Sequence, residues 1–178
     1  MGTIQIHDRH FKPYITAAEL DEAITRIAAS IERDYAGKTP LFLSILNGSF
    51  MFSAELFKKL TMPAEICFIK LASYKGTKST GHVITSIGLD DEVYDRDVII
   101  LEDIIDTGKT LSQFLPQLEH QQPRSLKVCA LLHKYEATLH PVDIGYLGFR
   151  IPDRFVVGFG LDYDGLGRNL PEIMQLAD

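Results

Sequence analysis

The sequence has no tryptophan, two cysteines and no long hydrophobic run among its 178 residues. No apolar stretch approaches the roughly 20 residues that a membrane-spanning helix needs, so we expect no membrane partner. Cys67 and Cys129 lie far apart inside apolar runs, which indicates two buried reduced thiols rather than a disulfide or a metal pair. The first fifteen residues lack the hydrophobic region of a signal peptide, and we therefore expect a cytoplasmic protein.

Positive charge is also scarce, because 18 Lys and Arg residues stand against 24 Asp and Glu residues and give a net charge of -6. A general nucleic-acid-binding protein usually has a basic face, so this class is not expected. The six histidines suggest no metal site. His7 and His10 are one helical turn apart, but their segment has no helical pattern, and we expect them on the surface.

Hydrophobic residues make up 46% of the chain and occur in well-separated runs, which is enough for one domain with a real core. Thr16 and Glu19 form a capping-box pattern that predicts a helix ending near Gly37. Further helices are predicted over residues 50–60 and 109–120. Strands are predicted over residues 41–46, 64–72, 83–88, 97–103, 126–133, 144–151 and 155–160. This alternation favours an α/β fold around a mainly parallel sheet.

The stretch VIILEDIIDTGKTL, residues 98–111, joins the strongest predicted strand to a helix. Gly108 allows successive backbone N–H groups to point inward, and Thr107 and Thr110 add hydroxyl donors. Together with the positive end of the helix, this loop can bind a phosphomonoester. It is not the loop of a nucleoside triphosphatase, because Asp103 stands where that motif requires glycine.

Three carboxylates, those of Glu102, Asp103 and Asp106, precede this phosphate site. Adjacent carboxylates at a strand end can accept hydrogen bonds from sugar hydroxyls, and a divalent ion would relieve their mutual repulsion. A solvated turn with Asp106 as the N-cap of the helix is the simpler alternative. The residues alone leave both interpretations open.

The same stretch resembles the phosphoribosyl pyrophosphate motif of the purine phosphoribosyltransferases, most of all their hypoxanthine-guanine members, and the similarity extends from about Leu41 to Leu170. The resemblance implies a type I phosphoribosyltransferase fold, with a mainly parallel sheet flanked by helices. It implies a single domain over residues 1–178. The core would span about residues 37–150, and a small hood would be built from residues 1–15 and 151–178.

By this resemblance, Glu102 and Asp103 hold the ribose 2′- and 3′-hydroxyls, and Mg²⁺ is the cofactor. Asp106 lies beside the purine N7 and is the candidate general base. The implied phosphate-binding segment consists of Asp106, Thr107, Gly108, Lys109 and Thr110. The implied metal-binding residues are Glu102, Asp103 and Asp162.

The segments LLHKYE and PDRFVVGFGLDYDGLGRNL resemble the base-recognition segments of the family. Lys134 matches the residue that donates to the purine 6-oxo group. Phe155 matches the residue that stacks on the base, and Val156 matches one that binds it through the backbone. Asp162 matches a residue near a second Mg²⁺ and the purine edge, and Arg168 matches a pyrophosphate contact.

SILNGSF resembles the pyrophosphate loop of the family, which contains a cis peptide bond, here the Leu46–Asn47 bond. Many relatives carry Lys or Arg at the position of Asn47, so the amides of Gly48 and Ser49 are expected to bind pyrophosphate. The polar stretch SYKGTKSTG resembles the catalytic lid, in which Ser73 and Tyr74 are the matching pair. Taken without the resemblance, this stretch is also consistent with the tip of a long hairpin.

The implied activity is the Mg²⁺-dependent transfer of phosphoribose from phosphoribosyl pyrophosphate to N9 of hypoxanthine or guanine, which gives IMP or GMP and pyrophosphate in purine salvage. A preference for xanthine is one alternative. Another is a non-catalytic regulator that keeps the fold and binds a nucleotide. The family's usual assembly implies a homodimer or a homotetramer.

Overall fold

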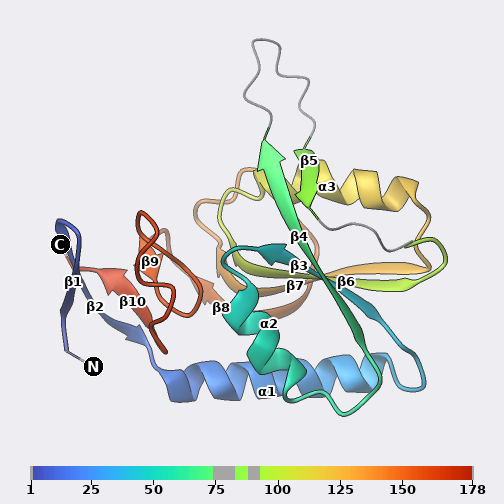
Figure 1. Cartoon of the computed structure of the whole chain (residues 1–178), viewed down its shortest axis with the longest axis horizontal. Helices are drawn as coiled ribbons and strands as arrows, with labels where there is room; N and C mark the ends of the chain where they lie inside the picture. The colour runs from blue at the N-terminus through green and yellow to red at the C-terminus, as the bar shows by residue number, and fades with distance from the viewer. Residues whose placement is uncertain (1, 74–82, 88–92, 178) are drawn as a thin grey trace, which may run out of the picture.

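The computed structural model describes residues 2–73, 83–87 and 93–177, and its largest element is a six-stranded sheet (Figure 1). The strands lie in the order β5–β4–β3–β6–β7–β8. Neighbouring strands from β4 to β8 are parallel, and β5 pairs with β4 in the antiparallel direction. The expected α/β fold with a mainly parallel sheet is therefore confirmed. The strand bounds are β3 Leu41–Leu46, β4 Glu65–Ser73, β5 Val83–Ile87, β6 Asp97–Ile105, β7 Ser125–Lys134 and β8 Ile144–Ile151.

Helices cover both faces of this sheet, which explains why its central strands are apolar at successive positions. The helices α1 (Ala17–Asp34) and α2 (Phe50–Phe57) lie on one face, and α3 (Lys109–His120) lies on the other (Figure 1). On β6, Ile99 and Leu101 pack in the core cluster of α1 and α2, whereas Val98 and Ile100 pack in the cluster of α3. Because β6 is buried on both of its faces, its carboxyl end has a fixed position. Among the described residues, no helix is long and apolar enough to cross a membrane.

The first helix begins as its capping box predicts. Thr16 Oγ1 accepts a hydrogen bond from the Glu19 backbone N–H at 3.3 Å, and Glu19 Oε2 accepts one from the Thr16 N–H at 2.8 Å. The helix ends at Asp34, three residues before the predicted stop at Gly37, and Tyr35 is its C-cap.

A second sheet joins the two ends of the chain in the order β1–β2–β10–β9 (Figure 1). Its strands are β1 (Ile4–Ile6), β2 (Arg9–Ile15), β9 (Val156–Val157) and β10 (Ile173–Leu176), and three of them were not predicted. The strand predicted over residues 155–160 was too long. Gly158, Phe159 and Gly160 have φ values of 98°, 49° and 104°, which no strand allows, so β9 stops at Val157.

The two thiols differ in burial. Cys129 is fully buried in β7, and burial raises the pKa of its thiol. Cys67 in β4 is half-buried, so the expectation of two buried thiols was wrong for this residue. It packs only at the margin of the α3 core cluster, near the edge of the sheet.

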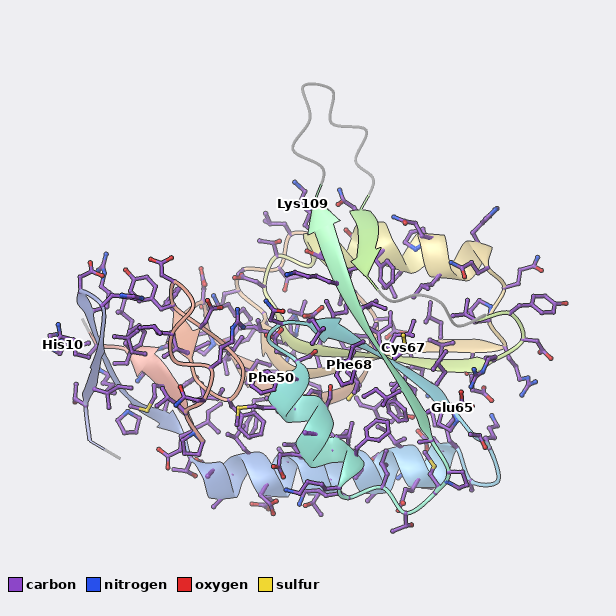
Figure 2. The ribbon with its side chains drawn as sticks, viewed as in Figure 1. His10, Phe50, Glu65, Cys67, Phe68 and Lys109 are labelled. Atoms are coloured by element: carbon purple, nitrogen blue, oxygen red, sulfur yellow. The ribbon has the colours of Figure 1, made fainter. Side chains whose placement is uncertain are left out.

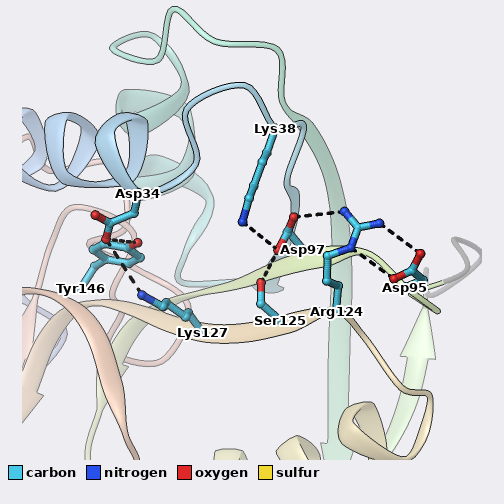
Figure 3. A network of polar contacts seen from close by, with 8 residues as sticks. All are labelled: Asp34, Lys38, Asp95, Asp97, Arg124, Ser125, Lys127 and Tyr146. Carbon is cyan, nitrogen blue, oxygen red and sulfur yellow. Dashed lines mark hydrogen bonds and ion pairs between the residues drawn. The ribbon is translucent and has the colours of Figure 1, made fainter.

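A network of charged side chains lies at the amino ends of the parallel strands (Figure 3). Asp97, the first residue of β6, is 4% exposed, and its carboxylate accepts a hydrogen bond from Ser125 Oγ at 2.6 Å. Lys38 Nζ and an Arg124 guanidinium nitrogen lie 3.6 and 3.5 Å from its oxygens. Asp97 therefore ties the starts of β6 and β7 to the segment before β3. This network lies at the end of the sheet opposite the carboxyl ends of the strands.

Candidate functional site

The loop between β6 and α3 is built around Gly108. This residue is the N-cap of α3, and its φ of 77° places it in the left-handed region. A Cβ atom at Gly108 would overlap the carbonyl oxygen of His140. The N–H groups of Leu139 and His140 donate to the carbonyl oxygen of Thr107 at 3.1 and 2.9 Å. Contacts with residues 139 and 140 thus fix the loop. Because Gly108 is the N-cap of α3, the alternative that Asp106 is the N-cap of this helix is wrong.

A cavity of about 250 Å³ opens above this loop. Lys109, the first residue of α3 (Figure 2), lines this cavity together with Leu71 of β4. Because N–H groups in the first turn of a helix lack partners within the helix, they can bind an anion here together with the positive end of the dipole. The lining also includes Glu102, Asp106, Thr107, Gly108 and Thr110.

Glu102 and Asp103 form a carboxylate pair near the carboxyl end of β6. Asp103 is 8% exposed, and its Oδ1 accepts a hydrogen bond from the Ile104 N–H at 2.8 Å. Burial and the neighbouring Asp103 charge raise the pKa of Glu102 well above its usual range. Burial also raises the pKa of Asp103. A group that donates hydrogen bonds, or a cation, would stabilise the ionised pair.

The loop after β3 lies against this pair. The peptide bond between Leu46 and Asn47 is cis, as the resemblance implies. A Cβ atom at Gly48 would overlap the carboxylate of Asp103, so a larger residue there would displace that carboxylate. Ser49 is buried and donates to the Ile45 carbonyl oxygen at 2.5 Å, whereas Asn47 is exposed. The backbone of the loop therefore reaches the carboxylate pair while the Asn47 side chain faces solvent.

A turn near the C-terminus closes the same side of the site. Arg168 contacts Asp162 Oδ1 at 2.6 Å and donates to the Gly160 carbonyl oxygen at 2.7 Å. The second carboxylate oxygen of Asp162 accepts a hydrogen bond from the Gly165 N–H at 2.7 Å. A Cβ atom at Gly160 would overlap the Gly48 carbonyl oxygen. The turn thus packs directly on the loop that follows β3.

Lys134, the last residue of β7, is 7% exposed and joins two carboxylates. Its Nζ donates to Asp106 Oδ2 at 3.1 Å and to Asp153 Oδ1 at 3.3 Å. Asp153 was not among the predicted site residues. Its position just after a predicted strand was the available signal, because the carboxyl ends of parallel strands meet at one edge of a sheet.

An exposed aromatic ring stands near these charges. The Phe155 side chain is 46% exposed, and Val156 beside it is buried in β9. The Phe155 ring lies 5.7 Å from the Tyr163 ring in an edge-on arrangement and 6.2 Å from the Phe11 ring. The Tyr163 hydroxyl donates to Asp8 Oδ1 at 2.8 Å. The ring packs against Phe11 and Tyr163, and its exposed part is open to a planar ligand.

The donor set suits a hard cation only in part. Across residues 2–73, 83–87 and 93–177, no group of three or more His, Cys, Asp or Glu side chains could hold a metal ion. Glu102 and Asp103 provide two carboxylates, which fits the way Mg²⁺ is commonly bound by few protein oxygens together with substrate oxygens. Asp162, the third expected ligand, is engaged by Arg168 and Gly165.

Most of the expected lid lies outside the described residues. Ser73 is the last residue of β4, and Tyr74 belongs to the part that is not described. The remaining predicted residues lie at the carboxyl ends of β3, β6 and β7, at β9 and in the C-terminal turn.

Comparisons with known proteins give a consistent result. Residues 16–164 match the family model described as the phosphoribosyl transferase domain. The hypoxanthine-guanine phosphoribosyltransferase of Streptococcus mutans is 40% identical over 153 residues, which is 85% of each chain. A solved hypoxanthine-guanine phosphoribosyltransferase of Bacillus anthracis is 35% identical with a TM-score of 0.86, covering 94% of this chain and 97% of that one. A hypoxanthine phosphoribosyltransferase of Trypanosoma cruzi, solved as a ternary substrates complex of a point mutant, is 36% identical with a TM-score of 0.86 and covers 93% of this chain and 94% of that one.

Proposed function

The chain belongs to the phosphoribosyl transferase domain family, and from this premise we propose that it is a hypoxanthine-guanine phosphoribosyltransferase of purine salvage. It transfers the 5-phosphoribosyl group of phosphoribosyl pyrophosphate to N9 of hypoxanthine or guanine. The products are IMP or GMP and pyrophosphate.

One observation carries this assignment: three kinds of binding group meet at one edge of the sheet. The start of α3 offers amides and hydroxyls to a phosphate, and the Glu102–Asp103 pair offers acceptors to sugar hydroxyls. The pair of Lys134 and Phe155 offers a cation and an open ring to a base. A ligand that joins phosphate, ribose and purine uses all three.

The proposed reaction forms the bond between N9 and C1′ and breaks the bond between C1′ and the pyrophosphate oxygen, which keeps the electron pair. Positive charge develops at C1′, and Asp106 accepts the proton that leaves N7 as N9 attacks. The amides of Gly48 and Ser49 bind the leaving pyrophosphate, with Arg168 beside them. Ser73 and Tyr74 belong to the proposed lid, which keeps water from the reactive centre.

We propose Mg²⁺ as the cofactor, held by Glu102 and Asp103 together with substrate oxygens. When bound, it would stabilise negative charge on the pyrophosphate. In the described structure Asp162 is occupied by Arg168, so it would contribute to metal binding only after that ion pair opens.

The choice of base follows from Lys134. An ammonium group only donates hydrogen bonds, so it pairs with the oxygen at C6 of hypoxanthine or guanine and not with the amino group at C6 of adenine. Phe155 stacks on the ring, and Val156 contributes backbone hydrogen bonds.

We further propose a homodimer or homotetramer that works in the cytoplasm. Phe50 on α2 and Phe68 on β4, both labelled in Figure 2, have exposed fractions of 42% and 41%, and together they would supply apolar area to a contact between subunits. The buried Cys129 thiol suits a reducing compartment. Sedimentation velocity measures the assembly directly, and a single monomer peak at micromolar concentration would contradict it.

The test of the function is pyrophosphate release from phosphoribosyl pyrophosphate and Mg²⁺ with hypoxanthine, guanine, xanthine or adenine. Turnover with the first two, and little with adenine, is expected. Turnover with xanthine alone would keep the mechanism and change the substrate. Tight binding without turnover would indicate a nucleotide-binding regulator.

A further inference from the structure

Lys134 is a nearly buried cation between two carboxylates from different parts of the chain. Its side chain is 9% exposed, whereas those of Asp106 and Asp153 are 51% and 60% exposed. The distances of 3.1 Å to Asp106 and 3.3 Å to Asp153 are nearly equal. Because an ammonium group has three donors, one is left for a further acceptor.

The carboxylates of Asp106 and Asp153 have different roles under the proposed function, on which this inference rests. Asp106 receives the N7 proton of the purine, and it then no longer provides a full negative charge to Lys134. If Asp106 were the only counter-ion, the buried ammonium would then be left unpaired. That state is costly in free energy, because nothing offsets the desolvation of the ammonium group. Recognition of the 6-oxo group therefore needs a second carboxylate that takes no part in the proton transfer.

Asp153 is placed for this duty by the strand next to β7. Ile151, the last residue of β8, pairs with Lys134 in the parallel register, and Asp153 follows two residues later. The Asp153 N–H donates to Glu136 Oε2 at 3.1 Å, which fixes the backbone beside Lys134. Phe155 lies two residues further on. One short segment thus carries both the counter-ion of Lys134 and the stacking ring.

We propose that Asp153 is a positioning residue that holds the Lys134 ammonium toward the purine 6-oxo group while Asp106 acts on N7. The third donor of Lys134 serves the 6-oxo oxygen. Asp153 touches neither substrate nor reacting atom in this scheme, and it acts only through Lys134.

The test compares two nucleotides that differ at the N1–C6 edge of the base. IMP carries the 6-oxo group and a hydrogen on N1, whereas purine riboside 5′-monophosphate carries only a hydrogen on C6. Calorimetric titration of the Asp153→Ala protein with IMP is expected to show a Kd about fivefold higher than that of the wild type, the effect of a partly exposed charge contact. The Kd for purine riboside 5′-monophosphate is expected to stay within about twofold. Asp153→Asn keeps an acceptor oxygen without the charge, so its IMP affinity is expected between the two.

The matched control is Asp143→Asn, which removes the same charge from an exposed residue just before the amino end of β8. Both nucleotides are expected to bind this variant as they bind the wild type. In steady-state assays, Asp153→Ala is expected to raise KM for hypoxanthine and to leave KM for phosphoribosyl pyrophosphate unchanged.

Equal weakening of both nucleotides, or unchanged IMP binding, would overturn the role of Asp153. Turnover of hypoxanthine by the wild type is measured first, so that this outcome is separate from failure of the proposed function. A wild type that releases no pyrophosphate would refute the function itself, whatever the variants do.

Discussion

Replacement of Gly108 by alanine tests whether the loop before α3 is shaped for phosphate. Gly108 has a φ of 77°, and a residue with a side chain costs about 1–2 kcal/mol in that region. The new methyl group would also overlap the His140 carbonyl oxygen, which belongs to backbone and cannot swing away. The loop would have to separate from residues 139 and 140.

That separation has a calculable cost. The hydrogen bonds from the N–H groups of Leu139 and His140 to the Thr107 carbonyl oxygen, 3.1 and 2.9 Å long, would be lost. At about 0.5–1.5 kcal/mol each, they bring the expected loss in the free energy of unfolding to about 2–5 kcal/mol. The loop amides would also move, so KM for phosphoribosyl pyrophosphate is expected to rise about tenfold or more.

The chain offers a matched control in Gly37, which has a φ of 74° and nothing within 4 Å of a built Cβ atom. Gly37→Ala shares the backbone strain and the smaller entropy of the unfolded chain, so both effects cancel in the comparison. Urea unfolding is expected to show a loss of about 1–2 kcal/mol for this variant, with normal KM values. Equal losses for the two variants, with unchanged KM in both, would refute the reasoning about the His140 contact.

Three further changes separate catalysis, metal binding and folding. Asp106→Asn is expected to lower kcat by about 10²–10⁴-fold in steady-state assays, because amides do not accept the N7 proton; an unchanged kcat would remove Asp106 from this role. Since the pKa of Glu102 is raised in the folded protein, its contribution to stability is present below about pH 4.5 and is lost as pH rises through the folded value. Glu102→Gln is therefore expected to stabilise the ligand-free protein by about 1 kcal/mol or more at pH 7.5. The same change is expected to weaken phosphoribosyl pyrophosphate binding. Thermal unfolding that shows the same gain in stability at pH 4 would contradict the assignment of this gain to the raised pKa of Glu102. Asp97→Asn is expected to lower the free energy of unfolding by about 1–3 kcal/mol. The matched change at the exposed Asp95, Asp95→Asn, is expected to leave it nearly unchanged. Equal losses in urea would show that burial of Asp97 is unimportant.

The large sheet and its helices could be predicted because their signals are local. The helix over Lys109–His120 and the strand over Ile144–Ile151 have the predicted bounds. In each case a periodic apolar pattern ends at a clear boundary residue. The capping box at Thr16 is also a local signal, and its hydrogen bonds are present.

The pairing of β2 with β10 in the second sheet could not be predicted because the two strands are distant in sequence. Phe11 of β2 pairs with Leu176 of β10, and no pattern near either residue indicates this. The strand predicted from FVVGFG failed for a related reason, since the left-handed residues after Val157 serve a turn that packs on the loop at Gly48.

Within residues 102–110, one motif places most of the expected residues around one cavity, and their functional roles stay predictions. The link from Lys134 to Asp106 and Asp153 depends on three separate segments that only the parallel sheet brings together. A sequence shows each residue, but it does not show their distances. The ion pair of Asp162 with Arg168 is another contact that the motif does not reveal.

The central claim is that the chain makes a nucleotide from a 6-oxopurine and phosphoribosyl pyrophosphate. The most direct measurement is the conversion of hypoxanthine in the presence of Mg²⁺, with the nucleotide identified by mass spectrometry and pyrophosphate measured in the same sample. IMP and pyrophosphate are expected in equal amounts. Binding of IMP without any conversion of hypoxanthine or guanine would contradict it.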